Sequence, residues 1–100
     1  MTASAFVLEP KGTGAFVGRG TLDFDSATQA LARGLDALNA GSNVEMDLSQ
    51  VTSGDSAGLA VLIEWLAAAR ARQVRLHYTG VPAQILAVAK ISDIEDLFLS

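Results

Sequence analysis

Apolar and polar residues alternate along several short stretches of the chain, with the period of two that is typical of half-buried β-strands. Residues 43–48 and 74–79 are the clearest cases, because every second side chain in them is apolar. Both stretches therefore predict strands with one face in the core and the other toward solvent. The polar residues 49–54, which follow the first of these strands, predict a loop.

Two earlier stretches, residues 5–9 and 15–20, predict a β-hairpin. A proline follows the first stretch, and the glycine-containing turn 11–14 separates it from the second. Gly18 and Gly20 weaken the second strand, so we expect a bulge or a sheet edge at this point.

Three other stretches carry the helical period. The first begins after Asp25 and Ser26, two residue types that favour the N-cap of a helix. The second opens at Asp55 and Ser56 and extends to about Arg72. The third follows a proline, which is tolerated in the first turn of a helix because the N–H group that it lacks has no partner there.

The order of these elements is β-β-α-β-α-β-α, and residues 91–99 predict either a final helical turn or a short edge strand. Strands separated by helices pair in parallel through right-handed crossovers. Their alternation is one-sided, whereas strands covered on both faces would be continuously apolar. We therefore expect an α/β fold in which a hairpin opens a mixed sheet and the helices pack mainly on one face.

The composition narrows the class of protein. Half of the 100 residues are hydrophobic and 18% are charged, which excludes an intrinsically disordered chain. The absence of cysteine excludes a disulfide framework and a thiolate metal site. The length predicts a single domain over residues 1–100.

Neither a membrane span nor a secretion signal is predicted. The longest apolar run, residues 59–69, is interrupted by Glu64 and is shorter than the roughly 18 residues that a span requires. The N-terminus lacks the basic region and the apolar stretch of a signal peptide. We therefore expect a cytoplasmic protein that does not insert into a membrane.

The charged residues indicate neither a nucleic-acid partner nor catalysis. The net charge is −4, and the only grouping among the seven Lys and Arg residues is Arg70, Arg72 and Arg75, at a predicted helix end where cations complement the helix dipole. His77, the one histidine, occupies an outward strand position without an adjacent nucleophile. No phosphate-binding glycine motif precedes a helix, so we expect no catalytic residue and no cofactor.

Four carboxylates near strand ends and loop starts suggest an alternative function, the binding of a hard cation. Converging carboxylate oxygens hold such a cation in the acidic pocket of response-regulator receivers. The four carboxylates are Asp23, Asp25, Asp47 and Asp55. Helix capping explains Asp25 and Asp55 without a metal ion, so no metal site is expected.

The most specific segment lies at the start of the second predicted helix and reads Asp55-Ser56-Ala57-Gly58-Leu59. Asp55 can accept hydrogen bonds from backbone amides of the first turn, and the Ser56 hydroxyl then faces solvent. Ala57 and Gly58 are small, which lets another surface approach the helix backbone closely. The alternative is an ordinary N-cap with a packing glycine. A phosphate on Ser56 would add about −1.5 to −2 charges at the positive end of the helix dipole.

This segment resembles a signature of the STAS domain family, which includes anti-sigma-factor antagonists and accessory modules of sulfate and phospholipid transporters. The signature is D-[ST]-x-G-L. Residues 20–23 are similar to the family's G-E-L-D motif, with Thr21 in place of the glutamate, and residues 46–49 resemble its third strand. The resemblance covers nearly the whole chain and implies the STAS fold and a non-enzymatic, protein-binding role.

Within the family, the chain is most similar to the small STAS subunit of Gram-negative phospholipid transporters, and this similarity extends through residues 76–82 and 86–90. It implies a subunit that binds the cytoplasmic ATPase of an ATP-binding cassette (ABC) complex at the inner membrane. Those subunits carry Thr at the position of Ser56, at the ATPase contact. Anti-sigma-factor antagonists carry there the Ser that their partner kinase phosphorylates, which leaves this second function as the alternative.

Helical geometry predicts a further part of the partner surface. At about 100° per residue, one stripe of the second helix faces the sheet: Leu59, Leu62, Ile63 and Leu66. Val61 and Trp65 lie on roughly the opposite side, and an outward tryptophan is typical of an interface. The alternative is a tryptophan folded over its neighbours. The predicted partner contact therefore comprises Asp55, Ser56, Ala57, Gly58, Val61 and Trp65.

Overall fold

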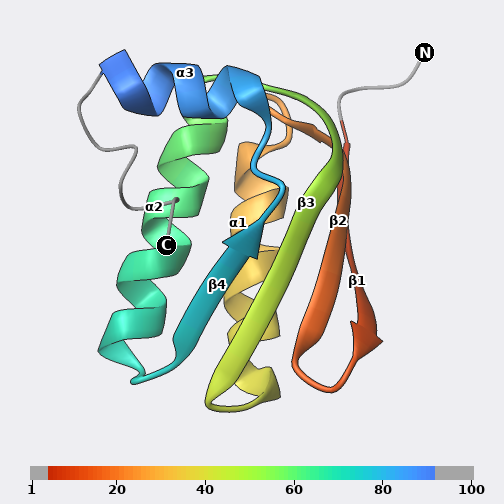
Figure 1. Ribbon diagram of the computed structural model, residues 1–100, viewed down its shortest axis with the longest axis vertical. Coiled ribbons are helices and arrows are strands. Elements are labelled where there is room, and N and C mark those ends of the chain that lie inside the picture. Colours follow the sequence, from red (N-terminus) through yellow and green to blue (C-terminus); the bar gives the residue numbers. More distant parts are fainter. Residues whose placement is uncertain (1–4, 92–100) are drawn as a thin grey trace.

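The computed structural model describes residues 5–91, which form a four-stranded sheet and three α-helices (Figure 1). The elements are β1 (Phe6–Gly12), β2 (Ala15–Leu22), α1 (Ala27–Ala37), β3 (Asn43–Gly54), α2 (Ser56–Ala71), β4 (Arg75–Thr79) and α3 (Ala83–Ile91), with a 3-10 turn at Leu38–Ala40. The sheet order is β1-β2-β3-β4; β1 is antiparallel to β2, whereas the β2–β3 and β3–β4 pairs are parallel. The predicted mixed sheet and the predicted order of elements are confirmed.

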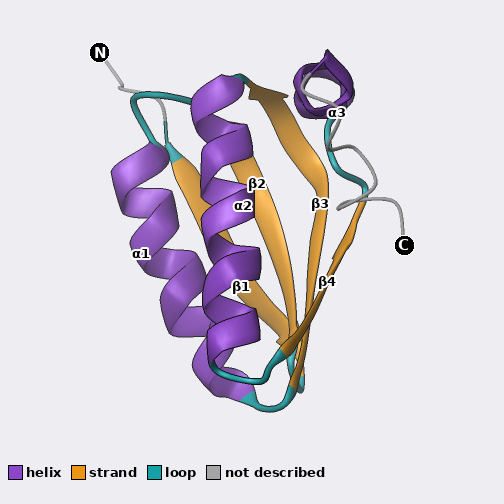
Figure 2. Cartoon of the chain, turned by 90° about the vertical axis from the view of Figure 1, so that its left-hand side faces the viewer, coloured by secondary structure: helices purple, strands orange, loops and turns teal. Residues whose placement is uncertain are grey.

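The helices are distributed unequally over the sheet. Helices α1 and α2 lie side by side on one face, whereas α3 crosses the end of the sheet where β3 ends (Figure 2). The core lies between the sheet and these two helices, and its fully buried larger side chains include Phe6, Leu22, Leu38, Met46, Leu48, Leu62 and Trp65. The expected one-sided cover is thus confirmed. In residues 5–91 no helix is long and apolar enough to cross a membrane.

The loop predicted for residues 49–54 is wrong, because β3 continues through Gly54. Gln50 and Val51 pair with the second half of β2, and Val51 is buried. The pairing shifts register beside Gly18 and again after Gly20, as expected for a strand weakened by two glycines. The polar residues of this stretch therefore belong to the solvent-exposed part of a strand and not to a loop.

Strand β1 is also longer than predicted, since it continues past Pro10 to Gly12. β1 has a paired neighbour on one side only in the described sheet, and an edge strand tolerates the missing N–H group of proline. The turn is confined to Thr13 and Gly14, where Gly14 adopts a φ of 69°, a left-handed conformation that glycine tolerates. At the other end of the chain, Ile91 completes α3, and the rest of the predicted final turn or strand lies outside the described residues.

The prediction that Val61 and Trp65 face outward is wrong. Trp65 is 0% exposed and Val61 is 4% exposed. The Trp65 ring lies against Phe6 and Tyr78, with ring centroids 6.0 and 6.4 Å away, and its Nε1–H group donates to the backbone oxygen of Leu31 at 3.1 Å. Trp65 is thus a core residue, and the alternative of a surface tryptophan folded over its neighbours is not borne out either.

The reason for this error is the position of α2 within the helical layer. α2 packs on the sheet and against both α1 and α3, so more than one side of it is buried. Leu59 and Leu62 face inward as predicted, but Ile63 and Leu66 are only half-buried. A helix that is apolar around most of its circumference lacks the polar face that would indicate its orientation.

Candidate functional site

The candidate site lies where two parallel strands end and two helices begin. β2 passes into α1 through residues 23–26, and β3 passes into α2 at Asp55. The two connections lie at the same end of the sheet, next to each other (Figure 1). A hydrogen bond joins them, because the Phe24 N–H group donates to Oδ2 of Asp55 at 3.4 Å. The ends of parallel strands are a common position for binding sites in α/β folds.

Asp55 caps α2, as predicted from the sequence. Its Oδ1 atom accepts hydrogen bonds from the N–H groups of Ala57 at 2.9 Å and Gly58 at 3.2 Å. These bonds satisfy two of the amides that lack a partner within the helix. Because Oδ2 receives the Phe24 amide, one carboxylate holds both the helix start and the neighbouring connection.

The next three residues divide between the surface and the core. Ser56 is exposed and Ala57 is half-buried, so both are available to a partner at the first turn of α2. Gly58 is buried, and a Cβ atom there would collide with the carbonyl group of Leu22 at the end of β2. The packing role of Gly58 is therefore the one that the structure supports, and the prediction that it leaves the helix end open to a partner is wrong.

Ser26 occupies the N-cap position of α1, but its side chain makes no capping hydrogen bond. Its hydroxyl instead donates to the Thr21 carbonyl at 2.8 Å and accepts from the Asp23 N–H group at 3.0 Å. The Ser26 N–H group in turn donates to Oδ1 of Asp23 at 3.1 Å. Ser26 is 1% exposed, so this network fixes the β2–α1 connection from within.

The structure adds Phe24 to the site, a residue that the sequence analysis did not select. Its side chain is 80% exposed, although it lies between a strand end and a helix start. The signal in the sequence was the run Asp23-Phe24-Asp25, since an aromatic residue between two carboxylates at a cap is poorly placed for a core. Phe24 and the predicted Asp55, Ser56 and Ala57 belong to one surface, whereas Gly58, Val61 and Trp65 are buried.

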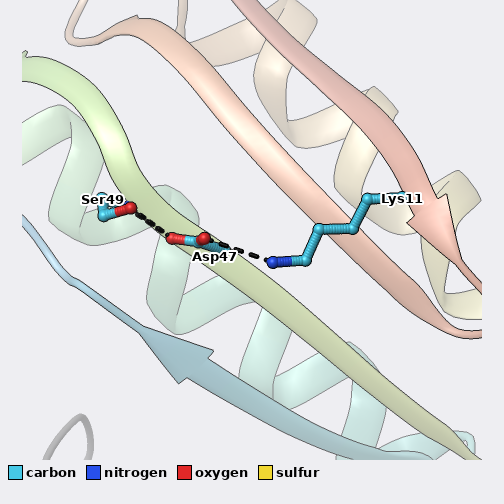
Figure 3. A network of polar contacts seen from close by, with 3 residues as sticks. All are labelled: Lys11, Asp47 and Ser49. Carbon is cyan, nitrogen blue, oxygen red and sulfur yellow. Dashed lines mark hydrogen bonds and ion pairs between the residues drawn. The ribbon is translucent and has the colours of Figure 1, made fainter.

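The four carboxylates considered for a cation site do not form one pocket. Asp47 projects from the open face of the sheet, where Lys11 and Ser49 contact it (Figure 3). Asp55 instead caps α2 and Asp23 binds the Ser26 amide. Within residues 5–91 no group of three or more His, Cys, Asp or Glu side chains is placed to hold a metal ion.

The carboxyl group of Asp47 contacts both Ser49 and Lys11 on the open face. Its Oδ1 accepts from the Ser49 hydroxyl at 2.6 Å and from the Ser49 N–H group at 2.9 Å, and Lys11 Nζ lies 3.3 Å from Oδ2. These contacts favour the ionised form and lower the pKa of Asp47 to about 2.

His77 is exposed on β4, as predicted.

Asp47→Asn should therefore alter the acid dependence of stability. A lowered pKa in the folded state stabilises the fold above the unfolded value of 3.8, and this contribution disappears as the pH falls to about 2. We expect the free energy of unfolding of wild type to exceed that of the variant by about 1 kcal/mol near neutral pH, a value that allows for solvent screening. This difference should disappear as the pH falls from about 4 to about 2. Urea unfolding across this pH range measures it.

Glu45→Gln is the matched control, because Glu45 lies on the same strand and face but outside the Lys11–Asp47–Ser49 network. A difference between wild type and Asp47→Asn that stayed constant from about pH 6 to pH 2 would contradict the assignment of the acid dependence to this carboxyl group.

The exposed, capped start of α2 lies beside the β2–α1 connection, to which the Phe24–Asp55 hydrogen bond joins it. Comparison with family models gives the class: the model described as "Mlab, STAS domain" matches residues 18–99. The chain therefore belongs to the STAS domain family, whose members are protein-interaction modules and are generally non-enzymatic. Among curated proteins the comparison finds no significant match.

Two solved structures share this fold. The unphosphorylated form of the anti-sigma-factor antagonist SpoIIAA is similar with a TM-score of 0.64 and 20% identity, over 86% of this chain and 82% of that chain. The phosphorylated form of SpoIIAA, a Bacillus cell-fate determinant, is similar with a TM-score of 0.68 and 20% identity, over 93% of this chain and 87% of that chain. At this identity the likeness shows the fold.

Proposed function

We propose that the protein is a non-enzymatic STAS subunit that binds the cytoplasmic ATPase of an ABC phospholipid transporter, as an MlaB-type partner of an MlaF-like ATPase. The observation that carries the proposal is the exposed first turn of α2, with Asp55 as its cap and Ser56 at its surface, in a chain that matches the Mlab-labelled family model. In this role the protein is cytoplasmic and reaches the inner membrane only through the transporter complex.

The contact would use the groups that the first turn of α2 presents. The Ser56 hydroxyl donates or accepts a hydrogen bond, and Ala57 lets the partner approach the helix. Asp55 contributes by positioning this surface, because its carboxylate binds both the first turn of α2 and the neighbouring Phe24 amide. A preformed surface of this kind loses little conformational entropy on binding.

An anti-sigma-factor antagonist controlled by phosphorylation of Ser56 is the second candidate. The observation that favours it is the exposed Ser56 at the positive end of the α2 dipole, together with a fold like that of SpoIIAA, which has been solved in a phosphorylated form. This candidate predicts that an anti-sigma kinase from the same genome transfers one phosphate from ATP to Ser56. Mass spectrometry of wild type and of Ser56→Ala tests it.

Ser56→Glu should weaken binding to the ATPase by about tenfold or more while leaving the fold intact. The longer, charged side chain occupies the contact, but an anion at a helix N-terminus interacts favourably with the dipole, so the domain stays folded. Titration calorimetry with the purified ATPase subunit of the ABC transporter from the same genome gives the Kd, and urea unfolding gives the stability.

Ala67→Glu is the matched control, since it adds the same charge at an exposed position of α2, about 16 Å further along the helix axis. The control should bind like wild type. Equal affinity of Ser56→Glu and wild type would remove the first turn of α2 from the contact. Binding of wild type to the anti-sigma kinase and not to the ATPase would favour the second candidate.

A further inference from the structure

A groove of about 670 Å³ lies between the second half of α2 and β4, away from the first turn of α2. Its lining is mainly apolar, with Ile63 and Leu66 on α2 and with Val74 and Leu76 at the start of β4. All four of these side chains are only half-buried. A cleft of this size and lining is typical of a binding site, so the groove has room for the apolar side chains of an occupant.

The groove borders the edge of the sheet. β4 pairs with β3 on one side, and within residues 5–91 no strand pairs with its other side. An unpaired strand edge exposes backbone N–H and C=O groups, and natural proteins commonly cover such an edge with a helix or a loop. An occupant of the groove would therefore cover the β4 edge as well.

The rim of the groove is basic. Arg70 and Arg75 both line it and are both exposed, and neither forms an ion pair within residues 5–91. Gln73, which also lines the groove, has a φ of 59°, a left-handed conformation that glycine usually adopts after a helix. A glutamine at this position adds an amide group to the rim. These three side chains favour an occupant that combines apolar residues with carboxylates.

The chain itself contains a segment of this composition directly after α3. Residues 92–100 read Ser-Asp-Ile-Glu-Asp-Leu-Phe-Leu-Ser and include no Lys or Arg. The acidic residues are Asp93, Glu95 and Asp96, and the apolar residues are Ile94, Leu97, Phe98 and Leu99. Ile91, the last residue of α3, is also apolar and is 86% exposed. The segment therefore matches the groove both in apolar character and in charge.

The segment is also long enough to reach the groove. α3 begins near the start of α2, since Oε1 of Gln84 accepts from the Gly54 N–H group at 3.2 Å, and it ends on the side of the molecule where α2 and β4 lie (Figure 1 and Figure 2). The groove begins at Ile63, about 11 Å from Ser56 along the axis of α2. An extended chain advances about 3.3 Å per residue, so about four residues cover this distance.

We propose that residues 93–99 bind in the α2–β4 groove, with their apolar side chains on Ile63 and Leu66 and their carboxylates beside Arg70 and Arg75. In this position the segment covers the β4 edge and adds to the apolar area that the domain buries. The inference goes beyond the proposed function and does not depend on it, because the groove lies outside the first turn of α2.

Introduced cysteine pairs test the position of the segment without background, because the chain contains no cysteine. The test pair is Ala67→Cys with Leu97→Cys, since Ala67 is exposed and lines the groove. The matched control replaces Ala67→Cys by Ala32→Cys, at an exposed position of α1, which packs on β1 and β2. We expect mild oxidation to form an intramolecular disulfide about tenfold faster, or more, in the test pair than in the control, as measured by mass spectrometry.

Equal rates in the two pairs would overturn the proposal and leave the groove to a separate partner. A disulfide between two copies of the test protein would also overturn it, because a second copy would then occupy the groove. Either result is independent of binding to the ATPase, so it would leave the proposed function standing.

A double-mutant cycle tests the contact itself. Phe98→Ala and Leu66→Ala should each raise the equilibrium constant of unfolding by about tenfold, measured with urea. If the two side chains meet, the double variant should raise this constant by clearly less than the product of the two factors, because the same contact is lost only once. Factors that simply multiply, or a Phe98→Ala protein as stable as wild type, would overturn the proposal.

Discussion

Trp65→Ala should lower the free energy of unfolding by about 3–5 kcal/mol, the range for truncating a fully buried tryptophan. The ring is 0% exposed and packs against Phe6 and Tyr78, so its removal leaves a cavity in the centre of the core. The substitution also deprives the Leu31 carbonyl of its indole donor. Urea unfolding followed by circular dichroism measures the loss. Tryptophan fluorescence cannot follow it, because Trp65 is the only tryptophan of the chain.

Trp65→Phe is the matched control. It keeps an aromatic ring in the same space and removes the indole donor, so we expect a loss of about 1–2 kcal/mol. Its affinity for the partner should equal that of wild type, because the position lies below the binding surface. A Trp65→Phe protein with wild-type stability and weakened binding would contradict the buried position and restore Trp65 to the interface.

The orientation of α2 shows where prediction from the sequence stops. Helical period gives the angles between side chains of one helix, but it does not say which side faces the core when nearly all sides are apolar. The deciding feature lies in α1, where Gly34 is buried and any Cβ there would collide with the Trp65 ring. A small residue in one helix thus makes room for a large residue in the next, and this match depends on the packing of two distant segments.

Some features of the candidate site were predictable because they depend on neighbouring residues and not on distant segments. The Asp55 cap depends on residues two and three positions ahead, so the sequence contains the whole interaction. The run Asp23-Phe24-Asp25 indicates that Phe24 is exposed, but the position of Phe24 beside α2 depends on the hydrogen bond to Asp55, a residue 31 positions away in the chain. The extension of β3 through Gly54 likewise depends on pairing with β2, more than thirty residues earlier in the chain.

Gly58→Ala should destabilise the domain by about 3 kcal/mol, although alanine is intrinsically the better helix former by up to about 1 kcal/mol. A Cβ at this position meets the carbonyl group of Leu22, a backbone group that cannot rotate away. The same carbonyl oxygen accepts the Asp55 N–H group at 3.3 Å. Lifting α2 to make room would therefore disturb the cap and the surface that Asp55 and Ser56 present.

Ala60→Gly is the matched control, because Ala60 lies two residues further along α2 on its exposed side. This variant should lose only about 1 kcal/mol of the free energy of unfolding, through helix propensity. The two interpretations of Gly58 predict opposite signs in urea unfolding. A small residue kept for the approach of a partner would allow Gly58→Ala to gain stability while losing affinity. A residue kept for packing against β2 requires the variant to lose stability, and its binding to fall because less of the protein is folded and the displaced first turn no longer matches the partner.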